Sequence, residues 1–322
     1  MKILVIGGAG YVGAHTVIKL LDSGHSVIVF DNFSTGQILN VDSRAIVHKG
    51  DILSKTDLKT VFQNNRIEAV IHLCALKDPG ESMINPLIYS KVNIIGTLNV
   101  LDVMLRNKVS NFIFSSSSAV YGEPKSEYIS EDQALSPVSY YGFTKLEIER
   151  VLNWYSKITN LNFISLRYFN AAGYDINNRV KLPEKKSTNL IPKIMNVIKG
   201  EEKTLKIFGS DYNTKDGTCI RDYIHVNDLA NAHAESLHYL KRREPPLLLN
   251  LATGIGYSVL DVVKKFEKLS SLKINYEFVE KRFGDPSIVV SKTKYKPFPI
   301  DWRPLHSDLE TIIKSVLKVH DI

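Results

Sequence analysis

A tyrosine and a lysine stand four residues apart in the segment SYYGFTK, which runs from Ser139 to Lys145. On a helix, Tyr141 and Lys145 would share one face with their Cβ atoms about 6 Å apart, whereas Tyr140 would face elsewhere. A nearby ammonium favours a phenolate and lowers the phenol pKa from its usual value of about 10. The spacing therefore predicts either a proton-transfer pair or one side of an ordinary amphipathic helix.

A glycine-rich turn near the N-terminus predicts a phosphate site. The segment ILVIGGAGYVGAHTVIKLL places three glycines between an apolar strand and a helix, namely Gly7, Gly10 and Gly13. Glycine lets backbone N–H groups approach a pyrophosphate that faces the positive end of the helix. Asp31 ends the second strand, where a carboxylate binds ribose hydroxyls and repels a 2′-phosphate, so NAD is favoured over NADP. The third strand ends in KGDI, which places Asp51 and Ile52 beside the adenine.

Short apolar runs alternate with amphipathic stretches through the first half of the chain. The predicted strands are Ile3–Ile6, Ser26–Phe30, Ala45–His48, Ala69–Leu73, Asn111–Ser115 and Asn162–Arg167, with helical patterns such as Ala14–Ser23 and Gly96–Asn107 between them. This alternation predicts a Rossmann-type, doubly wound parallel sheet in an α/β fold, with ligands at the carboxyl ends of its strands. After about residue 175 the pattern is irregular, but Leu247–Leu251 is an apolar strand that we expect to rejoin the sheet.

Composition argues against several other classes of protein. The 322 residues carry a net charge of +7, but the basic residues are scattered and no basic run is interleaved with aromatics, so we expect no nucleic acid partner. No apolar run approaches the roughly 20 residues of a membrane span, and MKILVIGGAG is typical of a first strand rather than a signal peptide. The two cysteines, Cys74 and Cys219, predict no disulfide or metal site, and they fit a reducing, cytoplasmic location.

Further motifs, together with the glycine turn and YGFTK, resemble the extended short-chain dehydrogenase/reductase family over nearly the whole chain. They are HLCALKDPGES (72–82), FSSSSAVYG (114–122), RYFNAAG (167–173), NLIP (189–192), DGTCIRDYIHVNDLA (216–230) and KRFGD (281–285). Within the family the chain is similar to the enzymes that epimerise UDP-hexoses at C4. The resemblance implies bound NAD, a UDP-sugar substrate and a homodimer built as a four-helix bundle. It also implies an NAD-binding domain at 1–175 and about 225–255, and a smaller, interleaved C-terminal nucleotide-sugar domain at 176–224 and 256–322.

The resemblance also implies a role for individual residues. Catalysis falls to Ser117, Tyr141 and Lys145, although strand alternation leaves Ser115 open as well and an error of one among Ser115–Ser118 is not excluded. The implied NAD contacts are Gly7, Gly10, Tyr11, Val12, Gly13, Asp31, Asn32, Asp51, Ile52, Leu73, Cys74, Ala75, Lys77, Asn93, Tyr141, Lys145 and Tyr168. The implied substrate contacts are Ser117, Asn170, Asn189, Leu190, Lys206, Phe208, Arg221, Arg282, Asp285 and Val289. For Asn93 a purely structural role is an equal alternative, and Tyr121 is expected to be structural.

Three departures from the family pattern bear on the substrate. Phe283 replaces an expected glutamate, and the 174–188 loop carries four lysines and arginines. Val289 occupies a position at the sugar pocket that is bulky or small in the family, so an N-acetylated sugar would fit. Two alternatives remain: a nucleotide-sugar 4,6-dehydratase or decarboxylase, and a non-catalytic NAD-binding scaffold. Ser118 and Ala119 stand where a dehydratase carries two carboxylates, which disfavours that reading.

Overall fold

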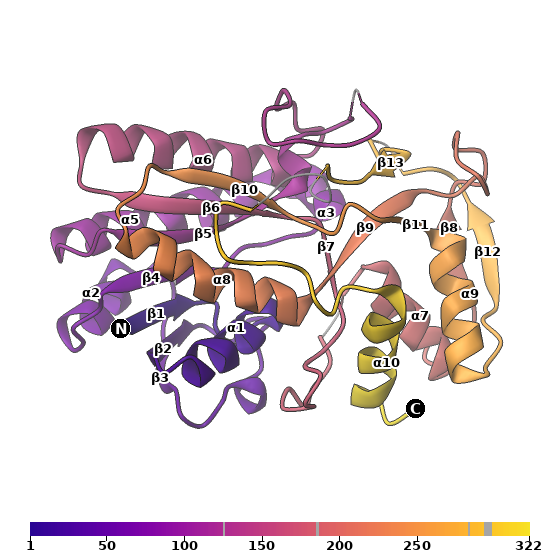
Figure 1. Ribbon diagram of the computed structural model, residues 1–322, viewed down its shortest axis with the longest axis horizontal. Helices are drawn as coiled ribbons and strands as arrows, with labels where there is room; N and C mark the ends of the chain where they lie inside the picture. Colours follow the sequence, from indigo (N-terminus) through magenta and orange to yellow (C-terminus); the bar gives the residue numbers. More distant parts are fainter. Residues whose placement is uncertain (125, 185–186, 283, 293–297) are drawn as a thin grey trace.

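A parallel sheet forms the centre of the computed structural model, which describes residues 1–124, 126–184, 187–282, 284–292 and 298–322. Within these residues the sheet has seven strands in the order β10-β6-β5-β4-β1-β2-β3 (Figure 1). They are β1 (Lys2–Ile6), β2 (Ser26–Asp31), β3 (Ile46–Lys49), β4 (Ala69–His72), β5 (Asn111–Ser117), β6 (Asn162–Tyr168) and β10 (Leu247–Leu251). The strand order reverses between β1 and β4, where such sheets open a ligand crevice. The predicted doubly wound sheet is confirmed, and β10 rejoins it beside β6.

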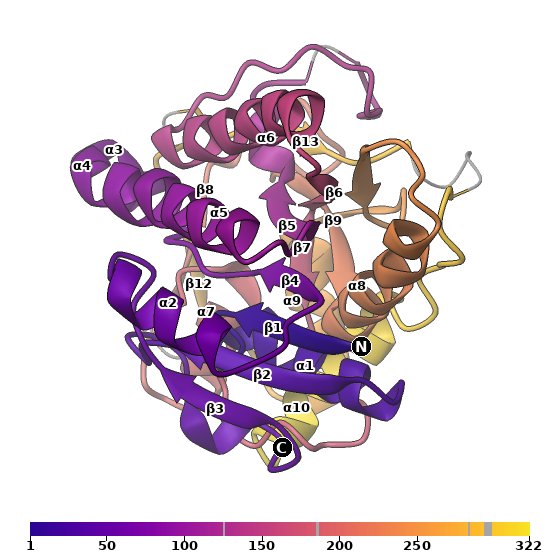
Figure 2. The ribbon, with the colours of Figure 1, turned by 90° about the vertical axis from the view of Figure 1, so that its left-hand side faces the viewer.

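Helices cover both faces of this sheet (Figure 2). One face carries α1 (Tyr11–Asp22) and α8 (Val226–Lys241), and the other carries α2 (Lys55–Gln63), α5 (Thr97–Arg106) and α6 (Tyr140–Ile158). Successive side chains of a strand point to opposite faces. Accordingly, Ile3 and Val5 of β1 join the apolar core under α1 and α8, whereas Leu4 and Ile6 join the core under α2, α5 and α6. The near-continuous apolar strands of the sequence follow from burial on both sides.

The second half of the chain builds smaller sheets and a separate apolar cluster. Two short sheets are formed by β7 (Asn170–Ala172), β9 (Ile220–His225), β11 (Gly256–Ser258) and β13 (Ile288–Val289), and by β8 (Leu205–Phe208) with β12 (Tyr276–Val279). They pack with α7 (Leu190–Ile198), α9 (Val259–Ser270) and α10 (Leu309–Val319). These elements lie beyond the carboxyl ends of the large sheet in Figure 1. The domain boundaries stated above stay a prediction.

One helical run bears on the sequence expectation about membrane spans. α3 (Pro79–Ile84), α4 (Pro86–Tyr89) and the π-helix η2 (Ser90–Gly96) lead directly into α5. From Pro86 to Arg106 this run has 21 residues and a mean hydropathy of 1.2 in its most apolar window, which is long and apolar enough to cross a membrane. Lys91, Asp102 and Arg106 interrupt this run, so it is not a continuous apolar stretch of the kind that the sequence was expected to lack. Because 44% of that window is buried inside the molecule, the run also fits the core helix of a globular protein.

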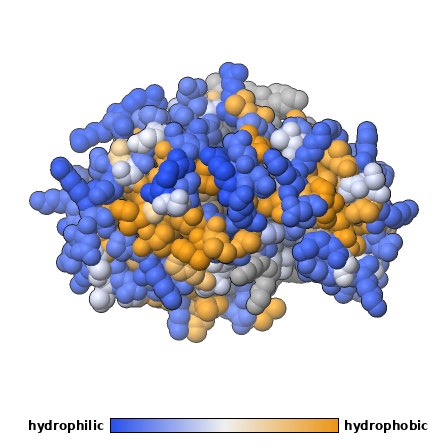
Figure 3. All heavy atoms as spheres, turned by 90° about the horizontal axis from the view of Figure 1, so that it is seen from below, coloured by the Kyte–Doolittle hydropathy of each residue, from blue (hydrophilic) through white to orange (hydrophobic). Residues whose placement is uncertain are grey.

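The outer edge of the sheet is covered less completely than its centre. Seen from below, the molecule has a largely hydrophilic rim, and apolar residues gather over the middle of this face and again toward its right (Figure 3). At the edge strand β3, Ile46 and Val47 are exposed, as are Ile38 and Leu39 of the short helix η1 (Ile38–Asn40). The central strands β1, β4 and β5, by contrast, are almost entirely buried, and the site lies at their carboxyl ends.

Candidate active site

A cavity of about 1000 Å³ opens at the carboxyl ends of β1, β2, β4, β5 and β6. Every site residue predicted from the sequence lines this cavity except Asn93. The glycine turn lies toward one end, and Arg221, Arg282 and Asp285 from the C-terminal elements lie toward the other. The folding of the chain thus brings together residues that are up to 282 positions apart in the sequence.

The glycine turn has the geometry of a phosphate cradle. Gly7 has φ +83°, and a Cβ on Gly13 would lie 2.1 Å from the carbonyl oxygen of Gly7, so no other residue fits there. α1 begins at Tyr11 without a side-chain cap and without an acidic residue in its first turn. The N–H groups of a first helical turn lack partners within the helix, and here they face the cavity. A pyrophosphate suits this place.

Asp31 closes the turn from the side of β2. Its carboxylate accepts hydrogen bonds from the N–H groups of Ala9 (3.0 Å) and Phe33 (2.8 Å). Burial raises the pKa of Asp31, although these two N–H groups act in the opposite direction. Beside it, the side chain of Asn32 donates to Asp51 (3.2 Å). A carboxylate with free lone pairs at this edge fits the ribose hydroxyls of a dinucleotide.

Tyr141 and Lys145 share one face of α6, as predicted. Ser139 caps this helix by accepting a hydrogen bond from the N–H of Gly142 (3.1 Å), and the Lys145 Nζ lies 5.8 Å from the centre of the Tyr141 ring. Tyr140 points elsewhere, and its hydroxyl bonds the hydroxyl of Ser90 (2.6 Å). The spacing of YGFTK therefore selects one phenol of the two for the cavity.

The electrostatics of this pair differ from the prediction. Burial raises the pKa of Tyr141, while a hydrogen bond with Ser117 lowers it by a smaller amount. Burial also lowers the pKa of Lys145 to about 8, against the opposing effects of Cys74 and Glu149. The Lys145 ammonium is used by the carbonyl oxygen of Ser115, to which it donates at 2.6 Å. The prediction that Lys145 lowers the phenol pKa is thus wrong for the protein alone, and the positive charge of an oxidised nicotinamide is the remaining source.

The four neighbouring serines have different partners. Ser117 interacts with Tyr141 and accepts a hydrogen bond from the N–H of Ala119 (3.2 Å), at the start of the short helix η3 (Ser118–Val120). Ser116 points to the opposite face of β5 and donates to Glu149 (2.6 Å). Ser115 bonds Tyr168, whose hydroxyl also bonds the buried Nε2 of His233. Strand alternation was therefore predicted correctly, and Ser117 is the serine beside the phenol.

Two predicted residues have structural contacts. Asn93 is buried in the π-helix η2, accepts a hydrogen bond from the N–H of Leu76 (2.8 Å) and donates to Thr144 (3.0 Å). It therefore joins the loop after β4 to α6, which supports the structural alternative. Tyr121 is buried and donates to Asn250 (2.7 Å), as expected of a structural residue.

The far end of the cavity carries paired charges. Arg221 forms an ion pair with Asp285, and the Arg282 guanidinium lies 3.7 Å from the centre of the Phe208 ring. Val289 is nearly buried in β13, beside Arg221 in the register of β9. The remaining predicted contacts here are Asn170 in β7, Lys206 in β8, and Asn189 and Leu190 at the start of α7. Phe283 lies outside the described residues, as do Lys185 and Lys186 of the basic loop.

The loop after β7 supplies residues that the sequence did not single out. Its segment Lys181–Glu184, here called the strap, is bound to η1 through the side chains of Gln37 and Asn40. Gln37 donates to Pro183 O (2.7 Å), and Asn40 accepts from the N–H of Leu182 (2.8 Å). At its other end Glu184 lines the cavity and forms an ion pair with Lys77, the residue expected near the NAD pyrophosphate. Nothing in the sequence pattern marks Glu184 for this role.

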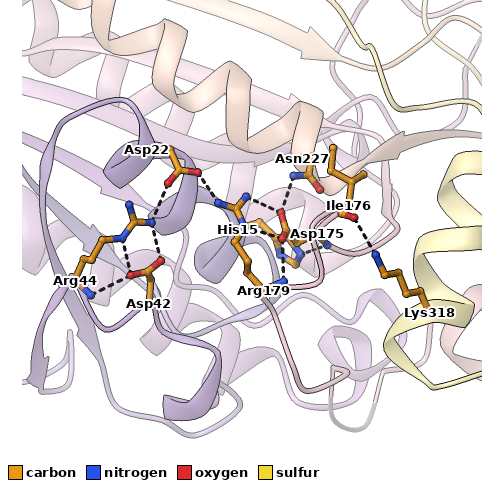
Figure 4. A network of polar contacts seen from close by, with 9 residues as sticks. All are labelled: His15, Asp22, Asp42, Arg44, Asp175, Ile176, Arg179, Asn227 and Lys318. Carbon is orange, nitrogen blue, oxygen red and sulfur yellow. Dashed lines mark hydrogen bonds and ion pairs between the residues drawn. The ribbon is translucent and has the colours of Figure 1, made fainter.

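Arg179 of the same loop and Arg44, which precedes β3, are paired with carboxylates behind the glycine turn (Figure 4). Arg179 donates to Asp175 (2.9 Å) and to Asp22 of α1 (2.5 Å), and Arg44 also donates to Asp22 (2.8 Å). The N–H of Asp175 donates to His15 (2.9 Å) inside α1. Arg179 and Asp175 thus hold the glycine-turn helix α1 in place from behind.

Comparisons with known proteins agree with this site. Residues 3–252 match the model of the NAD dependent epimerase/dehydratase family. A UDP-glucose 4-epimerase of Halalkalibacterium halodurans is 39% identical over 320 residues, covering 99% of this chain and 96% of the relative. The structure of UDP-glucose 4-epimerase from Bifidobacterium longum in complex with NAD⁺ and UDP matches with a TM-score of 0.92 and 33% identity, covering 100% of this chain and 98% of the other. The UDP-Glc/GlcNAc 4-epimerase of Campylobacter jejuni matches with a TM-score of 0.85 and 36% identity, covering 99% of both chains.

Proposed function

The chain belongs to the NAD dependent epimerase/dehydratase family, and we propose that it interconverts UDP-glucose and UDP-galactose by NAD-dependent epimerisation at C4. It is an isomerase that acts through a transient 4-keto sugar. One observation carries this proposal: Tyr141, Ser117 and Lys145 meet in a cavity that has a dinucleotide cradle at one end and paired arginines at the other. The match to relatives that carry this activity supports it.

The residues around the glycine turn fit NAD. The uncapped start of α1 receives the pyrophosphate, Asp31 the adenine ribose, and Lys77 the phosphates once it leaves Glu184. Leu73, Cys74 and Ala75 after β4, with Tyr168 at the end of β6, line the space for the rest of the cofactor. Bound NAD supplies the acceptor and donor of hydride, and the chain supplies position and proton transfer.

Proton transfer falls to three side chains. Tyr141 takes the proton of the sugar 4-hydroxyl and returns it after the ketone has turned over. Ser117 bonds the same oxygen and keeps it within reach of the phenol. Lys145 holds the end of β5 through Ser115 O.

Anchoring of the nucleotide lets the sugar turn while the substrate stays bound. Arg221 and Arg282 present guanidinium groups that suit a diphosphate, and Asp285 receives the uridine ribose. Asn170, Asn189, Leu190, Lys206 and Phe208 complete the nucleotide contacts. Binding requires Arg221 to exchange part of its ion pair with Asp285 for phosphate oxygens.

Val289 extends the range of sugars in this proposal. Valine leaves more room at the sugar pocket than tyrosine, so UDP-GlcNAc and UDP-GalNAc fit as further substrates. The similarity to the UDP-Glc/GlcNAc 4-epimerase supports this range. Purified protein that turns over UDP-galactose but neither acetamido sugar would contradict it.

A cytoplasmic homodimer is the expected working form. α6 packs beside α3, α4 and η2, and this layer leaves large apolar side chains exposed, including Leu87 (67%) and Trp154 (63%). A second copy placed across these helices would cover them as a four-helix bundle. Light scattering should give twice the mass of the chain, and Leu87→Glu should give monomers. Each copy of the chain in this dimer would consist of the NAD-binding domain and the nucleotide-sugar domain proposed from the sequence.

One activity assay decides between the candidate functions. Purified protein is incubated with UDP-galactose, and UDP-glucose is measured without added NAD. Product is expected, and its appearance without added NAD would mean that the cofactor had purified with the chain. A 4-keto-6-deoxy product would favour a dehydratase, and no product with NAD added would favour a scaffold.

A further inference from the structure

α6 holds the end of β5 through three residues that are spaced one helical turn apart. Tyr141 interacts with Ser117, Lys145 donates to the carbonyl oxygen of Ser115 at 2.6 Å, and Glu149 accepts from the hydroxyl of Ser116 at 2.6 Å. Positions 141, 145 and 149 share one helix face because they are four residues apart. The known pair of tyrosine and lysine is thus continued by a carboxylate.

Lys145 and Glu149 hold two consecutive residues of β5, on either side of the peptide bond that joins Ser115 to Ser116. The ammonium takes the carbonyl oxygen of Ser115, and the carboxylate takes the side chain of the next residue, Ser116. Ser117, which bonds the reacting oxygen, follows directly in the strand. A displacement of this peptide unit would therefore move both the serine and the lysine relative to Tyr141.

The carboxylate of Glu149 is fully buried and fully bound. Arg167 donates to both of its oxygens, from Nε at 2.9 Å and from Nη2 at 2.7 Å, and the two side chains are only 2% and 3% exposed. The hydroxyl of Ser165 lies 3.3 Å from Oε1, and Arg167 also donates to Tyr121 at 2.8 Å. Burying such a pair is costly and is weak evidence of a stabilising role, so its place behind the catalytic strand calls for another explanation.

We propose that Glu149 is a positioning residue for the reaction: balanced by Arg167, its carboxylate fixes Ser116 and with it Ser115 and Ser117. The same carboxylate lies one turn of α6 from Lys145 and favours the charged form of that lysine. The proposal rests on the proposed function, since it concerns the groups that hold and exchange the sugar proton. Glu149 itself touches neither cofactor nor substrate.

The surroundings of Lys145 make the sign of the charge effect definite. From β4, His72 is neutral because burial lowers its pKa to about 3, and the buried Cys74 stays a thiol because its pKa is raised to about 12. From α6, the phenol of Tyr141 is neutral in the protein alone, since burial raises its pKa. Glu149 is then the carboxylate that raises the pKa of Lys145.

The test uses four variants with separate expectations. Glu149→Gln keeps an acceptor for Ser116 but leaves the Arg167 guanidinium unpaired, so the alkaline limb of kcat should move to lower pH by about one unit. Glu149→Gln with Arg167→Met removes both charges and should return the limb toward the parent. Ser116→Ala should lower kcat about three- to ten-fold with KM and the limb unchanged. Glu147→Gln is the matched control, because Glu147 lies on the exposed side of α6 with Arg150 and should change nothing.

A readout without turnover separates this inference from the proposed function. The titration of Lys145 is followed by the ¹³C shift of its Cε in labelled holoprotein, assigned with Lys145→Arg, and it should move with Glu149→Gln in the same direction as the limb. Suppose that the parent enzyme is active and that Glu149→Gln changes neither the titration of Lys145 nor the alkaline limb of kcat. This result would overturn the effect of Glu149 on the charge of Lys145. An unchanged kcat in Ser116→Ala overturns the positioning role, whether or not Glu149→Gln folds. An inactive parent enzyme contradicts the proposed function instead.

Discussion

Two arginine–carboxylate networks support the cavity from opposite sides, and they differ in their access to water. Arg167 and Glu149 lie behind β5 and are fully buried, and each bonds further polar groups. Arg179 lies behind the glycine turn and is 35% exposed, with Asp175 and Asp22 as partners. Solvent reaches the arginine only in the second network, where Asp175 itself is buried. The buried network thus supports the strand beside the proposed proton-transfer groups, whereas the partly exposed network holds α1.

The largest expected effect lies on the dry side, at the phenol. Tyr141→Phe removes the hydroxyl that exchanges the sugar proton, so kcat for UDP-galactose should fall about 10²- to 10⁴-fold. The neighbouring Tyr140→Phe is the matched control, because that hydroxyl bonds Ser90 outside the cavity. If Tyr141→Phe and the parent enzyme have equal rates, Tyr141 is not catalytic. The buried Arg167–Glu149 network would then have no link to catalysis.

Next in size is the loss of one buried charge. Arg167→Met leaves Glu149 unpaired, so the free energy of unfolding should fall by about 3–5 kcal/mol. Arg179→Gln breaks a pair whose arginine is partly exposed and should cost less than Arg167→Met, because Asp175 keeps hydrogen bonds from the N–H of residue 179 and from Asn227. Urea denaturation of both holoproteins measures the contrast. Similar losses would show that water access does not distinguish the two networks.

Acid should weaken the outer network in two steps. Burial lowers the pKa of His15 to about 4, so the unfolded chain binds a proton that the folded chain refuses between pH 6.5 and 4. Stability should fall in this window, with His15 contributing about 3 kcal/mol. Despite the opposing effect of burial, hydrogen bonds with Arg179 hold the pKa of Asp175 well below its usual value, so its contribution is present above about pH 4 and is lost below.

Melting temperatures measured from pH 7 to pH 3 separate the two steps. His15→Gln should flatten the first step and Asp175→Asn the second. If both variants follow the parent curve, the acid sensitivity arises elsewhere, for example at His233, whose pKa is also lowered to about 4 by burial.

The smallest effect is expected at the solvent end of the outer network. Arg44 bonds Asp42 and Asp22 but is 49% exposed, and ion pairs of this kind contribute little. Arg44→Gln should change the melting temperature by less than about 2 °C, and its effect should shrink further in high salt. A larger loss would mean that the outer network behaves as a unit.

The sequence predicted the large sheet because burial on both faces produces apolar runs that periodicity detects. It predicted Tyr141, Ser117 and the glycine turn because each depends on local spacing, and a helix or strand fixes that spacing. Each of the seven strands was placed to within about two residues. The continuous helical run of α4, η2 and α5 was not predicted as one element, because short amphipathic windows divide it.

The rest of the site depends on contacts between distant segments. The pKa values of Tyr141 and Lys145 follow from burial, which no spacing reveals, so their electrostatics were predicted wrongly. Glu184 meets Lys77 only because the loop after β7 folds back to the segment after β4, 107 residues away in the sequence. Glu149 did leave a signal, as the third residue in the series that begins with Tyr141 and Lys145, but its partner Arg167 comes from another strand.

The strap has a consequence for how the protein would meet its cofactor. A dinucleotide bound at the glycine turn would lie beside Glu184, and the strap that carries Glu184 is held to η1 by Gln37 and Asn40. We therefore expect exchange with free nucleotide to be much slower than turnover. Since each catalytic cycle returns the same molecule to its oxidised state, the rate would be insensitive to the surrounding ratio of NAD⁺ to NADH.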